Sequence, residues 1–305
     1  MIGMRTKILL LVVVALALGW VWLRYWQFTA LDLPSTAPKP LVLGHAGSGF
    51  FTPFNPFNPL PPSSLAGVRH ALAQGADGVE VDVQLSQDSV LVLYHDPSLT
   101  SMTARGTGCV SQHPAADLTQ LRYRGGWPYD WFQEERLVTL DTVLQELKQR
   151  PTFPYLHFDL HEDDVCAAPK RTFARSPILA RQLVRQLMQR RVPLARVLVT
   201  STQLKTLKYV RTLLPATPVA LEIVAKFDAA FKQAQAAGIK TVLVKKDQIT
   251  PERAARIHAA GMQLVLFGGR SAGAMKKQLA FGPQAIETDN VTGLLSLLNR
   301  PVPRR

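Results

Sequence analysis

The second half of the chain alternates short apolar segments with segments of helical pattern, and this rhythm limits the possible folds most strongly. The apolar segments lie at 197–200, 219–223, 241–244, 263–267 and 284–288, and the helical ones near 202–214, 228–237, 250–260, 271–280 and 291–298. Short strands rich in Val, Leu and Ile that alternate with helices are typical of parallel βα units, whose sheet is buried on both faces.

Three further predicted strands complete the set. They begin near residues 41, 79 and 155, and residues 90–94 are assigned to the return arm of a β-hairpin that leaves the second strand. Eight βα units over about 260 residues predict an α/β fold, the (β/α)8 TIM barrel. We expect one barrel domain over residues 40–300.

The predicted hairpin, residues 78–96, gathers ionisable groups. Its apolar residues alternate with Glu80 and Asp82, so a strand aims both carboxylates at one side. Turn residues at 86–89 then fold His95 back beside them. A half-exposed hairpin with a polar solvent face is the alternative that the hairpin alone leaves open.

Other predicted strands also end in polar residues. The strand 155–161 places His157, Asp159 and His161 on one face. Active sites of TIM barrels lie at the C-terminal ends of the strands. The residues predicted at such ends are His45, Glu80, Asp82, Asp159 and Asp289.

These residue types suit metal-assisted phosphodiester cleavage. Glu80, Asp82 and Asp159 predict an all-oxygen site for Mg²⁺ or Ca²⁺, and His157 and His161 leave zinc as an alternative. A hard cation neutralises phosphate oxygens, while one histidine acts as base or nucleophile and another protonates the leaving oxygen.

Several segments together resemble the glycerophosphodiester phosphodiesterase family. They are Gly44-His45-Ala46-Gly47, residues 75–83, Tyr94-His95-Asp96 and Ile286-Glu287-Thr288-Asp289. The resemblance spans about residues 41–298 and implies a TIM barrel, a divalent metal, and hydrolysis of small glycerophosphodiesters to sn-glycerol 3-phosphate and an alcohol. It also implies that His45 and His95 are the catalytic pair and that Glu80, Asp82 and Asp159 bind the metal, with His45 as base or nucleophile and His95 as acid.

The chain departs from the family pattern at several positions. Ala46 stands where the family has Arg, Ser63-Ser64 replace a Glu-Asn pair, and Asp159 and His161 replace Glu and Lys. The lost Arg removes a fork suited to phosphate. We therefore expect other residues to contact the substrate, and the candidates are His161, Arg270 and Asp289.

Two alternative functions follow from these departures and from a Phe-rich loop at 50–64. The loop favours a lysophospholipase D or a cyclising phosphodiesterase that acts on lipids. The lost Arg favours a catalytically degenerate module that binds phosphorylated headgroups.

The N-terminus predicts attachment to a membrane. An apolar run at 8–23 lies within residues 1–29, which we interpret as an uncleaved anchor, and residues 30–39 as a linker. A cleaved signal peptide with a site near Ala15 is the alternative. The catalytic domain is thus expected in the periplasm or outside the cell, either anchored or secreted.

Charge and cysteine content limit the partners and the compartment. The formal net charge of +13 favours anionic partners, but no basic stripe interleaved with aromatics appears, so nucleic acid is not expected. Cys109 and Cys166 follow two site-forming strands, and we predict a disulfide that ties the long excursion at 97–138 across the barrel mouth. Two buried free thiols are the alternative.

Overall fold

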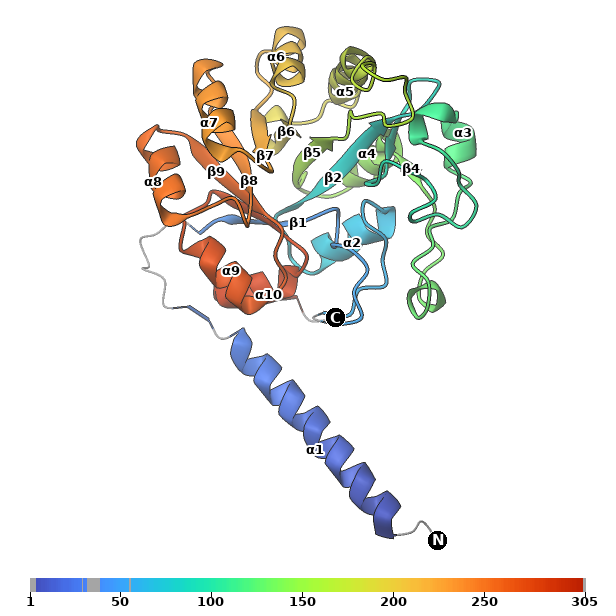
Figure 1. Cartoon of the computed structure of the whole chain (residues 1–305), viewed down its shortest axis with the longest axis vertical. Coiled ribbons are helices and arrows are strands. Elements are labelled where there is room, and N and C mark those ends of the chain that lie inside the picture. Colours follow the sequence, from blue (N-terminus) through green and yellow to red (C-terminus); the bar gives the residue numbers. More distant parts are fainter. Residues whose placement is uncertain (1–3, 29, 32–38, 55, 304–305) are drawn as a thin grey trace.

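Eight parallel strands form a closed barrel in the computed structural model, which describes residues 4–28, 30–31, 39–54 and 56–303 (Figure 1). In spatial order they are β1 (Leu41–Gly44), β2 (Gly78–Leu85), β5 (Tyr155–Leu160), β6 (Val197–Ser201), β7 (Val219–Ile223), β8 (Thr241–Lys245), β9 (Gln263–Phe267) and β10 (Ala285–Thr288). The barrel closes because β1 pairs with both β2 and β10. The predicted TIM barrel is confirmed.

Eight helices surround the barrel strands. They are α2 (Leu65–Ala73), α4 (Leu140–Lys148), α5 (Ser176–Gln189), α6 (Leu204–Leu213), α7 (Phe227–Ala236), α8 (Pro251–Ala259), α9 (Ala272–Leu279) and α10 (Val291–Leu297). Side-chain caps begin several of them: Ser64, Thr139 and Thr250 each accept a backbone N–H of the first turn. The main core lies between strands and helices, and a smaller core that includes Leu43, Leu198 and Val265 fills the barrel.

The second strand leaves the barrel as a hairpin. β2 pairs antiparallel with β3 (Leu91–Leu93), which pairs with β4 (Val138–Thr139). Between them the chain forms η1 (Val110–Gln112), α3 (Ala115–Leu118) and η2 (Tyr129–Trp131). This excursion has its own small core, in which Tyr94, Leu118 and Tyr123 are buried.

A disulfide joins Cys109 of the excursion to Cys166 in the segment between β5 and α5, the pairing that the sequence predicts. The two residues are 57 positions apart in sequence, and their Cα atoms lie 6.0 Å apart. The crosslink therefore holds the excursion against the loops that follow β5.

Helix α1 (Met4–Gln27) precedes the barrel and extends away from it (Figure 1). Its described side chains, at residues 9–20, are exposed, with Leu9, Leu11 and Leu16 more than 60% accessible. Within the described part of the chain, no helix has both the length and the apolar character needed to cross a membrane. Most of the predicted linker, residues 32–38, lies outside the described residues, so the anchor and linker stay predictions.

Candidate active site

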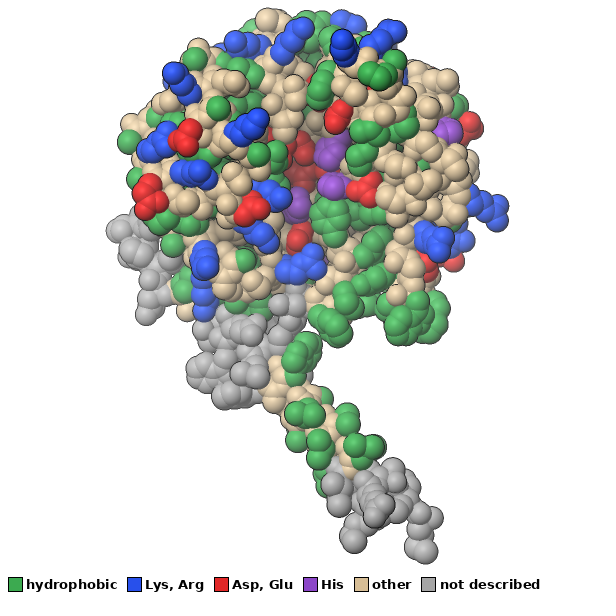
Figure 2. All heavy atoms as spheres, in the orientation of Figure 1, with side chains coloured by type: hydrophobic (Ala, Val, Ile, Leu, Met, Phe, Trp, Pro, Cys, Tyr) green, Lys and Arg blue, Asp and Glu red, His purple; other side chains and the backbone are tan. Residues whose placement is uncertain are grey.

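The C-terminal ends of the strands surround a cavity of about 500 Å³. Figure 2 looks into this mouth, where acidic and histidine side chains gather in the central hollow. Its lining includes His45, Glu80, Asp82, His95, Asp159, His161, Glu222 and Glu287. The structure therefore brings together both predicted histidines and all three predicted carboxylate ligands.

His45 directly follows β1 in a tight turn. Gly44 is required there, because a Cβ at this position would lie 1.9 Å from the carbonyl oxygen of Gly47. The His45 Nδ1 donates to Asp289 Oδ1 at 2.8 Å, and Nε2 lies 3.9 Å from Glu80 Oε2. Burial lowers the pKa of His45, but the hydrogen bond that it donates to Asp289 and the charges of the nearby carboxylates outweigh this effect and raise the pKa to about 10.

Glu80 and Asp82 point from β2 into the mouth and are each only 2% exposed. Glu80 Oε2 accepts the N–H of Ala46 at 2.6 Å, whereas Oε1 has no hydrogen-bond partner within the described structure. Burial and the charge of Asp82 hold the pKa of Glu80 well above its usual range. Burial would also raise the pKa of Asp82, but His161 overrides it and lowers that pKa.

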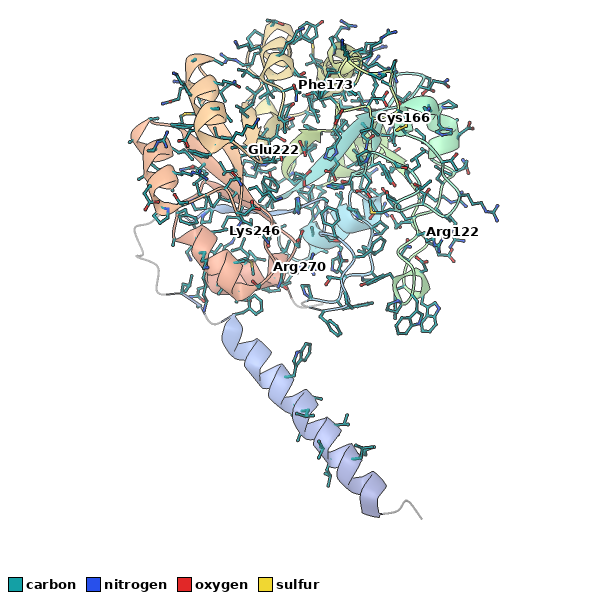
Figure 3. All side chains as sticks on the ribbon, in the orientation of Figure 1. Arg122, Cys166, Phe173, Glu222, Lys246 and Arg270 are labelled. Carbon is teal, nitrogen blue, oxygen red and sulfur yellow. A yellow bond between two sulfur atoms is a disulfide. The ribbon has the colours of Figure 1, made fainter. Side chains whose placement is uncertain are left out.

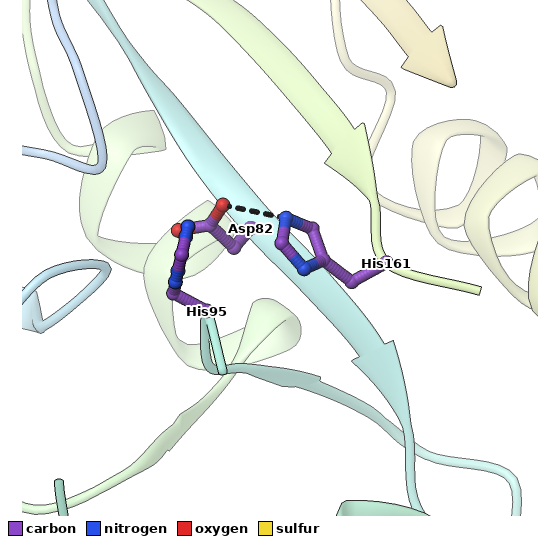
Figure 4. A group of neighbouring side chains, drawn as sticks. All are labelled: Asp82, His95 and His161. Atoms are coloured by element: carbon purple, nitrogen blue, oxygen red, sulfur yellow. Dashed lines mark ion pairs between the residues drawn. The ribbon is translucent and has the colours of Figure 1, made fainter. Parts of the chain in front are cut away.

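Asp159, near the end of β5, and His161, just after it, lie beside Asp82. The parallel register pairs Asp82 with Asp159. The Nε2 of His161 lies 2.9 Å from Asp82 Oδ1, a contact shown in Figure 4, and 3.1 Å from Asp159 Oδ2. Burial lowers the pKa of His161, but the two carboxylates raise it well above the ordinary value. His161, which the sequence predicts to contact the substrate, thus lies between the carboxylates of Asp82 and Asp159.

His95 comes from the hairpin, directly after the return strand β3 and Tyr94. Its Nδ1 lies 2.6 Å from Asp96 Oδ1. Gln84 holds the turn by donating to the carbonyl oxygens of Tyr94 and Asp96 at 2.8 and 2.9 Å. The ring of Phe50 contacts both catalytic candidates, with centroids 4.8 Å from His95 and 5.5 Å from His45. A residue of the Phe-rich loop therefore contacts both histidines.

The donor set fits a divalent cation. One potential ligand atom from each of Asp82, His95 and His161 lies within 4.8 Å of the others. The buried Glu80 Oε1 adds an oxygen without a partner among the described residues. Buried carboxylates that lack enough hydrogen-bond donors are stabilised by a bound metal ion.

His157 is not available to such an ion. Its ring is 5% exposed, and Nδ1 lies 2.6 Å from Glu287 Oε1 in the barrel interior. The zinc alternative that used both His157 and His161 therefore loses one of its ligands.

Arg270 and Asp289 lie on the His45 side of the mouth (Figure 3 labels Arg270). Arg270 Nη2 is 3.4 Å from Asp289 Oδ2, and Asp289 accepts from His45. Asp289 thus orients the ring of His45 through a direct hydrogen bond. The side chain of Arg270, next to Asp289, is about one-third exposed.

Ser63, Glu222 and Glu287 belong to the site but are not among the site residues predicted from the sequence. Ser63 Oγ donates to Asp82 Oδ2 at 2.7 Å, from a backbone with φ of 54°. Glu222 ends β7 and lines the mouth, and burial together with the charge of Asp159 raises its pKa well above the usual range. Glu222 and Glu287 are each the only charged residue of a largely apolar strand, and this pattern could have identified them as site residues.

Comparison with known proteins gives a consistent result. The model of the glycerophosphoryl diester phosphodiesterase family matches residues 57–292. A probable glycerophosphodiester phosphodiesterase 1 of Mycobacterium tuberculosis is 36% identical over 113 residues, 35% of this chain, and the match covers 38% of the relative's length. A glycerophosphodiester phosphodiesterase of Bacillus altitudinis is 27% identical over 75% of this chain and 89% of the relative.

Solved structures share the fold. A phosphodiesterase of Oleispira antarctica, in complex with the product sn-glycerol-3-phosphate, has a TM-score of 0.71 at 23% identity and covers 85% of this chain and 97% of its own. A putative glycerophosphoryl diester phosphodiesterase of Silicibacter pomeroyi has a TM-score of 0.72 at 18% identity, with coverage of 90% and 96%.

Proposed function

The chain belongs to the glycerophosphoryl diester phosphodiesterase family, and we propose that it hydrolyses glycerophosphodiesters to sn-glycerol 3-phosphate and an alcohol. One observation carries this proposal: His45 and His95 line one mouth together with three carboxylates. The relative from Bacillus altitudinis is named for this activity, and the Oleispira antarctica structure holds its product.

We propose that Glu80, Asp82 and Asp159 would hold a divalent cation. Oxygen ligands suit Mg²⁺ or Ca²⁺. The imidazole of His161 lies beside these oxygens, and nitrogen ligands suit transition metals, so tests of metal dependence should also include Mn²⁺ and Zn²⁺. When bound, the cation neutralises the non-bridging oxygens of the phosphodiester.

The two histidines divide the proton transfers. Asp289 fixes the Nδ1–H tautomer of His45, so Nε2 faces the acidic side of the mouth as base or nucleophile. Asp289 and the neighbouring carboxylates raise the pKa of His45 to about 10, so His45 would act as a base where a bound cation offsets their charge. His95, held by Asp96, donates the proton to the leaving alcohol oxygen.

Phosphorus NMR of the products tests the reaction class. Incubation of the full-length protein with glycerophosphocholine should produce the resonance of glycerol 3-phosphate from the earliest time points. A cyclic phosphate that accumulates first would assign the chain to the cyclising phosphodiesterases instead. Binding of glycerophosphocholine without turnover would favour the headgroup-binding module.

A second candidate, lysophospholipase D activity, is favoured by an apolar groove beside the mouth. The groove has a volume of about 680 Å³, lies along α5 and α6, and is lined in part by Pro177 and Tyr209. It shares Glu162, Phe173 and Gln203 with the mouth, so an acyl chain could lie there while its phosphodiester enters the site. Tyr209→Ser should then lower kcat/KM for lysophosphatidylcholine and leave that for glycerophosphocholine unchanged.

We also propose that the protein is anchored to a membrane with its barrel outside the cytoplasm. The exposed apolar side chains of α1 and the disulfide support this location. Protein that alkaline carbonate washes off isolated membranes would argue for the cleaved, secreted form.

A further inference from the structure

Exposed aromatic side chains cluster at one end of the barrel. They come from the loop after β1 and from the excursion around η2, and we call them the aromatic tip: Phe54, Phe57, Trp127, Trp131 and Phe132. Trp127 and Trp131 are 76% and 75% exposed, although their rings lie in edge contact at 6.0 Å. Such a group of large apolar side chains at the surface marks an interaction site.

The two loops of the aromatic tip support each other. The ring centroids of Phe57 and Phe132 lie 5.2 Å apart, and Phe51 lies 5.1 Å from Tyr129. Gly125 allows this packing, because a Cβ there would come within 2.7 Å of the Phe51 ring. The tip is therefore a packed unit held in place by contacts between two segments of the chain.

An arginine-rich pocket lies next to the tip on the same excursion. Its volume is about 550 Å³, and its lining includes Arg105, Arg122, Arg124 and Arg136 (Figure 3 labels Arg122). Buried Tyr123 separates Arg122 from Arg124 in an extended segment, so both guanidinium groups lie on the face opposite the small core. We call this the arginine pocket.

Few acidic groups offset these charges. Asp130 lines the pocket, but its carboxylate accepts the backbone N–H groups of Gly125 and Gly126 at 2.7 and 3.0 Å. Arg122 pairs with Glu134 at 3.2 Å, an exposed contact that contributes little. The arginine pocket thus keeps a surplus of positive charge for an anionic ligand.

Helix α1 lies on the same side of the barrel as the aromatic tip. The ring of Trp20 contacts that of Phe54, at 6.5 Å between centroids. The exposed apolar residues of α1, including Leu9, Leu11 and Leu16, continue beyond this contact away from the barrel (Figures 1 and 2). A plane through Trp20 and the tip would separate apolar α1 from the charged barrel.

We propose that the aromatic tip and the arginine pocket form a face that lies on a lipid bilayer containing anionic phospholipids. Trp and other aromatic rings prefer the interface between headgroups and acyl chains. Arginines near such a surface bind phosphate headgroups and are attracted by its negative potential. The +13 net charge of the chain agrees with this partner. Docking of this face does not require the hydrolytic activity.

Tryptophan fluorescence can isolate this face in the full-length protein. The five tryptophans of the chain are Trp20, Trp22, Trp26, Trp127 and Trp131. Replacing the first three by Phe leaves only the two on the excursion. This variant is reconstituted into vesicles of brominated phosphatidylcholine, with and without phosphatidylglycerol. We expect quenching and a blue shift that increase with phosphatidylglycerol and decrease with salt.

Arginine variants test the pocket within the same assay. Arg122→Gln with Arg124→Gln should lower the apparent affinity of the face for phosphatidylglycerol vesicles by about fivefold per arginine. The matched control, Arg171→Gln with Arg185→Gln, removes the same charge from exposed positions outside the pocket and should have little effect. Circular dichroism establishes that both variants are folded.

Three outcomes would overturn the proposal. If neither lipid mixture quenches the fluorescence, the aromatic tip faces water or a protein partner. If the pocket variant and the control variant are quenched equally, the arginine pocket is not part of the face that contacts the bilayer. Saturable binding of inorganic phosphate to the pocket, without vesicle-dependent quenching, would assign the pocket to a soluble anion.

Discussion

At the residue scale, the two histidines proposed to be catalytic have different surroundings. His45 lies among Glu80, Glu287 and Asp289, whereas His95 contacts Asp96 and the ring of Phe50. The environment of His45 suits a group that works close to the metal ligands. His95 is more exposed, at 34% against 16%, and can reach a leaving group at the cavity edge.

The acid role of His95 predicts a dependence on the leaving group. His95→Ala should lower kcat with glycerophosphocholine by about 10²–10⁴-fold, because the choline oxygen leaves poorly without a proton. With a nitrophenyl phosphodiester, whose leaving group needs no proton, most of this loss should disappear. If His95→Ala lowers kcat equally with both substrates, His95 is not the general acid.

Ser63 should position Asp82 for the metal. Its hydroxyl donates to Asp82 Oδ2 and accepts from the backbone N–H of Asp82. Ser63→Ala should weaken metal binding by about tenfold or more, as removal of such supporting hydrogen bonds does elsewhere. Calorimetric titration measures the affinity, and Ser296→Ala on α10 is the matched control. An unchanged affinity would exclude this role.

Glu222 predicts a pH-dependent stability. Burial and nearby acids raise its folded pKa above the ordinary value, so its ionisation costs more in the folded than in the unfolded protein. The penalty is absent below the unfolded pKa and grows as pH rises above it. In metal-free protein Glu222→Gln should therefore raise Tm at pH 7 and leave Tm at pH 4 unchanged. A Tm that is lower or unchanged at pH 7 would contradict this account.

The sequence predicts some site residues better than others. Glu80, Asp82 and Asp159 stand out because they alternate with apolar residues along predicted strands. Ser63 does not, because its role depends on a contact across 19 residues that no local pattern encodes. Glu222 is a single acid in an apolar strand, and only closure of the barrel brings it to the mouth.

At the element scale, the regular βα units and the excursion differ in how far sequence determines them. The strands and helices after residue 197 follow strong periodic patterns with caps such as Thr250, and their predicted bounds lie within a few residues of the observed ones. Elements η1, α3 and η2 have only three or four residues each. Such short elements carry no period and depend on tertiary packing around residues such as Tyr123.

The disulfide should stabilise the excursion. Cys109 and Cys166 close a long loop, so the crosslink restricts the unfolded chain and should contribute about 2–4 kcal/mol. Urea unfolding with and without reductant measures the difference. Mass spectrometry of alkylated, non-reduced protein should find neither thiol modified; two free thiols in exported protein would contradict the crosslink.

At the scale of the whole molecule, the barrel mouth adjoins two other surfaces. It shares lining residues with the groove along α5 and α6, and the loop after β1 connects it to the aromatic tip. Phe50 contacts both His45 and His95, and the neighbouring Phe51 packs on Tyr129 of the excursion. Contacts within the loop after β1 therefore link the face proposed to meet the bilayer with the catalytic pair. The sequence indicated the residues of the mouth and the Phe-rich loop, but only the closed barrel shows that they adjoin.

Release of glycerol 3-phosphate from glycerophosphocholine by the full-length protein in detergent tests the central claim most directly. The comparison includes each divalent metal, a chelator, His45→Ala, and His113→Ala as a partly exposed control away from the mouth. The account predicts metal-dependent release that falls by about 10²–10⁴-fold in His45→Ala and is unchanged in His113→Ala. Release that resists the chelator, or that persists in His45→Ala, would contradict it.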